Sequence, residues 1–491
     1  MRAARTLIVA ALAAGLCACA NLKAAPPPLR PDTPARFAEA EPEAAGGPAD
    51  LALWWTGFHD PILDDLVGRA LHGNLDLQQT AARIDEARQQ EIIAGARRLP
   101  SAQVDSSAGR NRISEHAIPL PPGAGQGGGH APSPFGIPGS EFNSFRLGLD
   151  ASWELDLFGG ARSGLKAASA RREAAEWSRR DLQVALAAET AAHYLSLRAL
   201  QQREAIAWRE LSRQRELLSI VSSRADAGLI SHLDVSQQQA LVDIAEAKAY
   251  PIEARIRAEI HALGVLVGEP PEALITTLTP VAAAPTPPPA PPPGLPSELL
   301  RRRPDIRRAE REVAASAADV GVATADLYPK ITLSAQPSLV STALSSLIDW
   351  GSRNYTLSAG LLWPIFDGGR LKAQLAGANA RQSEALISYR KAVLTGLLDV
   401  EDSLSLYQAD DARRGSLAAA LEEARRAEAL ARDQYGSGVV GYANVLAAQQ
   451  AVIGDEDQLA DAEAARSQDV VGLYKVLGGG WRQEDLQGNK P

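Results

Sequence analysis

The sequence predicts a mainly α-helical protein with membrane-type β-strands, built from two similar halves. Three observations predict this fold class. The same motifs recur at matching spacings in both halves, each half contains a long helical stretch without proline, and each contains segments of alternating apolar and polar residues. Hydrophobic residues make up 45% of the 491 residues and charged residues 22%, which excludes a disordered chain. The net charge of −9 argues against a nucleic-acid partner, because proteins that bind nucleic acid normally carry a basic excess.

The first residues, 1–18, are predicted to be a signal peptide. Arg2 and Arg5 precede the apolar stretch 7–16, which is too short to cross a bilayer. The chain then reads "LCAC", which resembles a bacterial lipoprotein signal with Cys19 as the acylated, palmitate-bearing first residue of the mature chain. An ordinary secretory leader with two incidental cysteines is the alternative interpretation.

Two proline-rich segments separate the predicted parts of the chain. Residues 19–49 are expected to form an extended tether behind the lipid anchor, and residues 281–296 a stiff linker between the two halves. Cys19 is the expected acylated residue and the only other cysteine, Cys17, precedes it in the signal peptide, so the mature chain is expected to have no disulfide and no thiolate metal site. No later run of 18 apolar residues exists, so a membrane crossing would use strands.

The two halves of the chain are predicted to be structural repeats. The first spans 50–280 and the second 297–480, followed by a tail at 481–491. The motif "WELDLFGGAR" matches "WPIFDGGR", and the next matched glycine follows 68 residues later in the first repeat and 69 residues later in the second. The matched residues are Pro100 with Pro329, Gly160 with Gly369, Gly228 with Gly438, and Asp234 with Asn444.

Each repeat is expected to begin with a helix that ends at a proline and to continue with a pair of strands. The pairs are placed at about 101–153 and about 330–364. Apolar residues alternate with polar residues there, which is the period of a strand with one face of each kind. Such segments are typical of outer-membrane strands, whereas half-buried strands of a soluble sandwich are the alternative. The apolar positions are Leu147, Leu149, Ala151, Trp153, Ile331, Leu333, Ala335, Tyr355, Leu357, Ala359, Leu361 and Trp363.

A glycine turn and a long helical hairpin are expected to follow each strand pair. The helices run without proline for about 100 Å, at 1.5 Å per residue, before the chain turns back. The return helix of the first repeat is expected to break at Pro251, and that of the second to continue to Gly478. The predicted turns from strand to helix are Gly159, Gly160, Gly368 and Gly369, and the predicted tips are residues 228–234 and 438–444.

Four strands cannot close a sheet, and lipid does not tolerate an open edge, so the chain is expected to associate. The order of lipoprotein signal, paired strands, "FGG" and "DGG" turns, long helices and glycine tips resembles the outer-membrane efflux factors. These are TolC-like proteins, and the resemblance is to their acylated, NodT-type branch, with "LPSELLRRRPDIRRAE" (295–310) as a hallmark. The resemblance covers residues 50–480. It implies a homotrimer that forms a 12-stranded outer-membrane β-barrel and a long periplasmic α-helical barrel.

The function that the resemblance implies is the outer-membrane exit channel of a tripartite efflux pump. Such a channel passively conducts drugs or other toxic small molecules and thereby contributes to antibiotic resistance. The implied partners are a periplasmic adaptor protein, an inner-membrane RND-type pump and outer-membrane lipid. An exit duct for protein or peptide secretion is the alternative, and a non-channel helical scaffold in the periplasm is a third interpretation.

The sequence contains no recognisable catalytic constellation. The seven histidines are scattered without a zinc-binding spacing, and the glycine-rich residues 123–130 lack the frame of a phosphate loop, so they are expected to form an exterior loop. We therefore expect no enzyme, cofactor or metal site. In the arginine cluster 301–308, Pro304 is expected to start a helix, Asp305 to favour its N-terminal dipole, and the arginines to pair with carboxylates.

The tips are the predicted functional site. In the family, these turns form both the gate of the channel and the surface that meets the adaptor. Asp234 and Asn444 can also cap the following helices, and the resemblance implies a closing hydrogen bond between Tyr435 and Asp234. Asn444 and Ala447 stand where relatives commonly have acidic residues, so the gate is expected to use apolar contacts and hydrogen bonds rather than a carboxylate ring. The implied residues are Gly228, Leu229, Asp234, Val235, Tyr435, Gly438, Val439, Ala443, Asn444, Val445, Ala447 and Gln450.

Overall fold

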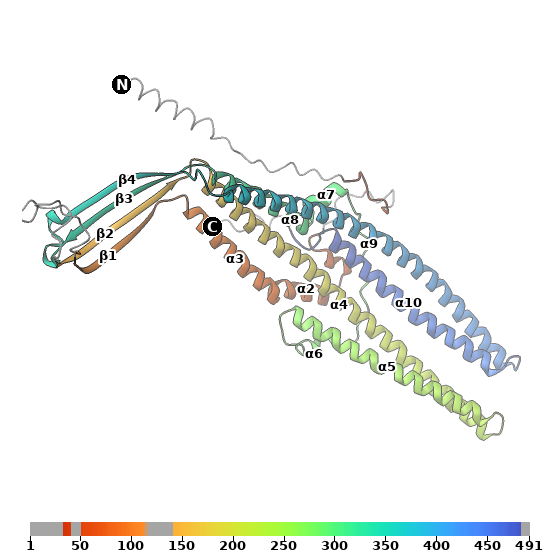
Figure 1. Ribbon diagram of the computed structural model, residues 1–491. Coiled ribbons are helices and arrows are strands. Elements are labelled where there is room, and N and C mark those ends of the chain that lie inside the picture. The colour runs from red at the N-terminus through yellow and green to blue at the C-terminus, as the bar shows by residue number, and fades with distance from the viewer. Residues whose placement is uncertain (1–32, 41–50, 113, 115–140, 483–491) are drawn as a thin grey trace, which may run out of the picture. The chain divides into compact units, whose positions relative to one another are not determined.

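The computed structural model describes residues 33–40, 51–112, 114 and 141–482 (Figure 1). The predicted signal peptide, Cys19, most of the predicted tether, the glycine-rich residues 123–130 and the end of the predicted tail lie outside the described residues. Among the helices of the described residues, none combines the length and the hydrophobicity that a membrane span needs.

The chain folds into two compact units, each made from both predicted repeats. Within the described residues, the strand unit consists of residues 87–112, 114, 141–171 and 313–385, and the helical unit of residues 33–40, 51–86, 172–312 and 386–482. The division into compact units therefore differs from the division into repeats, which stays a prediction.

The strand unit contains one antiparallel sheet in the strand order β1-β2-β3-β4. Its edge strands β1 and β4 each pair with one strand within the described residues. The sheet is therefore open on both sides in a single chain. The strands are β1 (Ser101–Arg112), β2 (Glu141–Leu155), β3 (Lys330–Ser341) and β4 (Arg353–Leu362).

The two faces of this sheet differ in polarity. Pairs such as Val104 with Leu149 and Ala335 with Leu357 place apolar side chains on one face across all four strands. Val104 is 73% exposed and Leu357 is 74% exposed. The opposite face carries an ion pair in which Arg146 Nε lies 3.0 Å from Asp105 Oδ2. An exposed apolar face opposite a polar face is typical of strands that border lipid.

The helical unit is built around two antiparallel hairpins, which Figure 1 shows as the pairs α4 with α5 and α9 with α10. The outgoing helices each have 67 residues and the return helices each have 35. The long helices begin in the strand unit and continue into the helical unit. The helices are η1 (Trp54–Phe58), α2 (Pro61–Gly73), α3 (Leu75–Ala96), α4 (Gly160–Asp226), α5 (His232–Leu266), α6 (Ile275–Leu278), α7 (Pro296–Arg302), α8 (Pro304–Ala325), η2 (Leu344–Ser346), η3 (Trp350–Ser352), α9 (Arg370–Gly436) and α10 (Tyr442–Val476).

The expected break at Pro251 is wrong, because α5 continues through this residue. A proline inside a helix removes one backbone hydrogen bond and costs about 3 kcal/mol. Ala249 and Ile256, on either side of it, are 1% and 7% exposed, so packing holds both halves of the helix in line. The burial of these apolar side chains offsets the free-energy cost of the proline inside the helix.

The main core of the helical unit joins short segments to one face of the long helices. Trp54 of η1 stacks on Tyr474 of α10 with 5.1 Å between the ring centres. Tyr194 of α4 is fully buried and donates a hydrogen bond to Asp60 Oδ2 over 2.6 Å. Burial and the bond to Asp60 raise the pKa of Tyr194 to about 12. The core thus ties the segment before α2 to the middle of α4.

The arginine cluster lies where α8 begins, as the sequence predicts. α8 starts at Pro304, and Arg303 donates to both carboxylate oxygens of Asp305 over 3.0 and 2.7 Å. Arg303 also donates to Asp399 of α9 over 2.9 Å and to the carbonyl of Val476 in α10 over 3.3 Å. A single buried guanidinium therefore joins the start of α8 to two other helices.

Candidate functional site

Both tips begin with the same backbone turn. At the end of α4, the amide of Leu229 donates to the carbonyl of Arg224 and that of Gly228 to Ala225, both over 2.9 Å. At the end of α9, the amides of Val439 and Gly438 donate to Gln434 and Tyr435 over 2.8 and 3.0 Å. This pattern requires a left-handed residue, and Gly228 and Gly438 have φ of 72° and 77°. Glycine adopts that conformation without strain.

The helices that follow the turns begin differently in the two tips. Ser231, not Asp234, is the N-cap of α5, and Asp234 completes a capping box by accepting from the amide of Ser231 over 3.1 Å. In the second tip, Gly441 is the N-cap of α10 and no side chain caps the helix. The expectation that Asn444 caps α10 is therefore wrong, because Asn444 occupies the third helical position and the N-cap residue, Gly441, has no side chain that could cap the helix.

The predicted site residues divide into an exposed group and a packed group. Leu229 is 73% exposed and Val439 is 72% exposed, at matching positions of the two turns. Val445 is 4% exposed and therefore buried, while Tyr435 and Val235 are half-buried. The remaining residues are exposed: Gly228, Asp234, Gly438, Ala443, Asn444, Ala447 and Gln450.

A cation–aromatic cluster that the sequence analysis missed joins the two tips. The guanidinium carbon of Arg224 in α4 lies 4.9 Å from the ring centre of Tyr435 in α9. The ring of Tyr435 lies 5.7 Å from that of Tyr442 in α10. The Tyr442 hydroxyl is buried and has no hydrogen-bond partner within the described part of the chain. Burial raises the pKa of Tyr442, and the charge of Arg224 lowers it by a smaller amount.

The only signal for this cluster in the sequence is the pair of tyrosines on either side of Gly438, since Arg224 lies 211 positions before Tyr435. In the described chain, Tyr435 contacts Arg224, whereas Asp234 belongs to its own capping box. The hydrogen bond between Tyr435 and Asp234 stays a prediction.

The predicted turns from strand to helix lie in the strand unit. Gly159, Gly368 and Gly369 have positive φ, and Gly160 is the first residue of α4. Asp156 accepts from the amides of Ala161 and Arg162 over 3.0 and 2.9 Å, and so caps α4. Asp367 caps α9 in the same way, with the amides of Gly369 and Leu371 at 3.0 and 2.8 Å. Matching carboxylates thus fix the direction in which both long helices leave the sheet.

Comparison of the sequence with known protein families and with individual proteins agrees with this architecture. The family model described as outer membrane efflux protein matches residues 66–269 and 295–479. The pyoverdine export outer membrane protein OpmQ of Pseudomonas aeruginosa is 37% identical over 440 residues, which are 90% of this chain and 90% of that protein. Nodulation protein T of Rhizobium leguminosarum bv. viciae is 30% identical over 93% of this chain and 89% of that protein.

A solved structure of the outer-membrane channel OprN matches with a TM-score of 0.81 and 35% identity, covering 93% of this chain and 99% of that one. The predicted fold class and the predicted resemblance are thereby confirmed. The family consists of channels and not of enzymes, and its members lie in the outer membrane and extend into the periplasm. The chain belongs to the outer membrane efflux protein family and is an exit channel of an efflux system.

Proposed function

We propose that three copies of this chain form one passive duct, which receives small toxic molecules from a periplasmic adaptor and an inner-membrane RND-type pump. The observation that supports this proposal most strongly is the structure of the sheet. It has an exposed apolar face and two edge strands that each lack a second partner within the described residues. Lipid does not tolerate unpaired strand edges, so β1 of one copy would pair with β4 of the next. Three copies of four strands give twelve strands, enough to close.

The contacts between the long helices support the same assembly. Below the tips, α4 contacts α5 through Gln214 and Gln238, at 2.6 Å between the side chains. It also contacts α10 through Arg203 and Asp457, at 2.9 Å. α10 in turn contacts α9, as in the 2.6 Å bond between Arg466 and Asp411. The helices thus follow the order α5, α4, α10, α9, which leaves α5 and α9 to contact neighbouring copies.

The tips are proposed to be both the gate and the adaptor-docking surface. Each copy contributes two turns, so a trimer would present six. Leu229 and Val439 offer exposed apolar side chains at every turn, which suits contact with a partner protein. Behind them, Arg224, Tyr435 and Tyr442 hold the two turns of one copy together. We propose that this cluster favours the closed arrangement, and that the bond between Tyr435 and Asp234 acts with it.

The anchor and the cargo complete the proposal. Cys19 would carry the lipid that attaches the mature chain to the outer membrane. Small molecules are the proposed cargo, because the relative OpmQ is named for the export of pyoverdine. Protein or peptide secretion is the alternative function.

Purification of the full-length protein from outer membranes tests the proposal. We expect a trimer that resists mild heating and conducts ions in planar bilayers, and incorporation of labelled palmitate that the Cys19→Ser variant loses. A periplasmic monomer without conductance would contradict the proposed assembly.

A further inference from the structure

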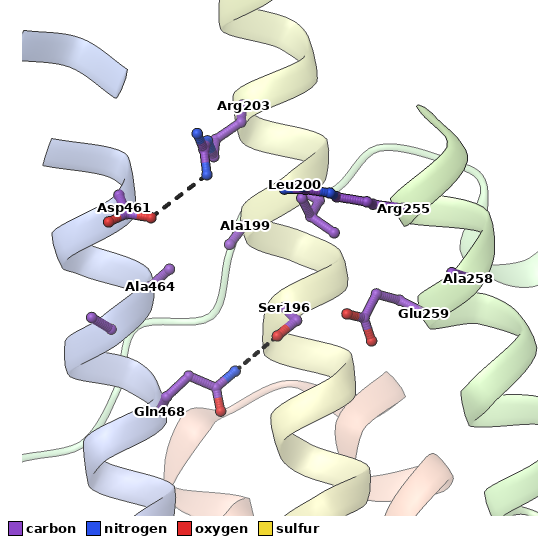
Figure 2. A pocket seen from close by; sticks show the side chains of 11 residues that line it. Ser196, Ala199, Leu200, Arg203, Arg255, Ala258, Glu259, Asp461, Ala464 and Gln468 are labelled. Atoms are coloured by element: carbon purple, nitrogen blue, oxygen red, sulfur yellow. Dashed lines mark hydrogen bonds and ion pairs between the residues drawn. The ribbon is translucent and has the colours of Figure 1, made fainter. Parts of the chain in front are cut away.

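A groove of about 370 Å³ lies along α4, between α5 and α10, far in sequence from both tips (Figure 2). This volume falls within the usual range of small-molecule sites, roughly 300–1,000 Å³. Small residues line much of the groove, and Leu200 adds an apolar wall. The small residues are Ser196, Ala199, Ala258, Ala464 and Ala465.

The groove is on the side of the helices opposite to the main core. On α4, the buried Tyr194 and the groove residue Arg203 are nine positions apart, which is about two and a half turns at 3.6 residues per turn. On α10, Asp461 lines the groove and Val470, also nine positions away, is fully buried in the core. Both helices therefore present one face to the core and the reverse face to the groove.

This placement assigns the groove to the inside of the proposed duct. The core side of α4 and α10 is covered by η1 and α2. A conducting tube must leave its interior open, so these covering elements belong outside and the groove side belongs inside. The groove would then occur once per copy along the path of the cargo.

Most charges of the groove are already paired. Arg203 donates to both carboxylate oxygens of Asp457 over 2.9 and 3.1 Å and lies 3.5 Å from Asp461. Glu259 lies 2.6 Å from Nδ1 of His193.

One cation of the groove has no such partner. Arg255 of α5 makes no hydrogen bond or ion pair with any residue that the structure describes, and Figure 2 shows its side chain running from α5 toward the α4 side of the groove. Ser196 accepts a hydrogen bond from Gln468 over 3.1 Å, which leaves its own O–H to donate. Within the described residues, the groove thus has one guanidinium without an ion-pair partner and one hydroxyl that can donate a hydrogen bond. Alanine side chains line the groove beside them.

We propose that this groove is a binding site for small organic anions on their way through the duct. A carboxylate or similar group would pair with Arg255 and accept from Ser196, while the apolar body would lie on Leu200 and the alanines. Guanidinium groups suit carboxylates because they present several N–H donors in one plane. The position inside the duct rests on the proposed function, whereas the recognition of an anion rests on the groove alone.

The test compares benzoate with benzamide, which has the same shape but no charge. In planar bilayers, benzoate is expected to reduce the single-channel conductance of the wild-type protein in a saturable way, and benzamide is not. The Arg255→Gln variant should raise the half-blocking concentration of benzoate by about threefold or more, as expected for one partly exposed ion pair. Arg257→Gln is the matched control, because Arg257 is on the same helix, pairs with Glu253 and is absent from the groove lining.

Ligand-observed NMR on the detergent-purified full chain measures the same contact without any conductance. A benzoate signal that responds to the wild-type and Arg257→Gln proteins and responds less to Arg255→Gln would support the anion site, even if no pore conducted. A lack of conductance together with this NMR result would contradict the proposed function and leave the anion site supported. Equal responses to benzoate and benzamide, or an unchanged response with Arg255→Gln, would overturn the anion site.

Discussion

Arg224 lies over the ring of Tyr435, with its guanidinium carbon 4.9 Å from the ring centre, so the last turn of α4 touches the last turn of α9. A contact of this kind contributes about 0.5–2 kcal/mol, depending on how far water is excluded. Tyr442 of α10 also contacts Tyr435, with 5.7 Å between the ring centres. The two turns of one copy are therefore held to each other as well as to their own hairpins.

Arg224→Gln is predicted to open the gate. Loss of about 1 kcal/mol per copy would raise the open-to-closed equilibrium constant about fivefold for each copy. Arg224→Lys keeps a cation and should restore most of the closed state. Arg215→Gln is the control, because Arg215 is also on α4 but pairs with Glu246 of α5, at 3.1 Å. An open probability that stays at the wild-type value in Arg224→Gln would show that this contact does not hold the gate.

Tyr435→Phe separates the two roles proposed for this tyrosine. The substitution keeps the ring over Arg224 and removes the hydroxyl that would bond to Asp234, so a rise in open probability is expected from loss of the hydroxyl alone. Asp234→Ala should have a similar effect. Because it also breaks the capping box of α5, Ser231→Ala serves as the control that disturbs the cap and keeps the carboxylate. Wild-type gating in Tyr435→Phe would exclude the hydrogen bond.

Asp469 of α10 is predicted to make stability depend on pH. Burial, and then the charge of Asp410, raise its pKa from 3.8 to about 6. Since the folded pKa lies above the unfolded value, the protonated form favours folding below about pH 4, and this contribution is lost as the pH rises through about 6.

Asp469→Asn should therefore stabilise the protein at pH 7.5 and change little at pH 4. The expected gain is on the order of 1–2 kcal/mol, after a discount for partial exposure. Thermal unfolding midpoints in detergent at both pH values measure it. An equal shift at the two pH values would mean that protonation of Asp469 is not the cause.

Arg303→Met is predicted to destabilise the helical unit strongly. The substitution removes the hydrogen bonds to Asp305 and Asp399 and leaves their carboxylates without a cation. Breaking one side of a buried ion pair typically costs about 3–5 kcal/mol. Arg301→Met, at an exposed position two residues earlier, should change the free energy of unfolding by less than about 0.5 kcal/mol. Similar unfolding midpoints for the two variants would contradict this role for Arg303.

The sequence predicts the backbone of this protein better than its side-chain contacts. Glycines with a required left-handed conformation, such as Gly228 and Gly438, mark the turns because few other residues fit there. The alternation of apolar and polar residues predicts the strands, because successive side chains of a strand point to opposite faces of the sheet. The predicted break at Pro251 is wrong because the burial of Ala249 and Ile256 outweighs the local preference of proline against a helix interior. The Arg224 contact and the groove depend on residues that are distant along the chain, so no local pattern reveals them.

Single-channel recording on the purified full-length protein tests the central claim most directly. Three copies that close the sheet and the helical layer should give discrete conductance steps in planar bilayers, with brief openings that become longer in the Arg224→Gln variant. A stable outer-membrane trimer that never conducts, in either the wild-type or the Arg224→Gln form, would contradict the proposal that this assembly is a gated exit duct.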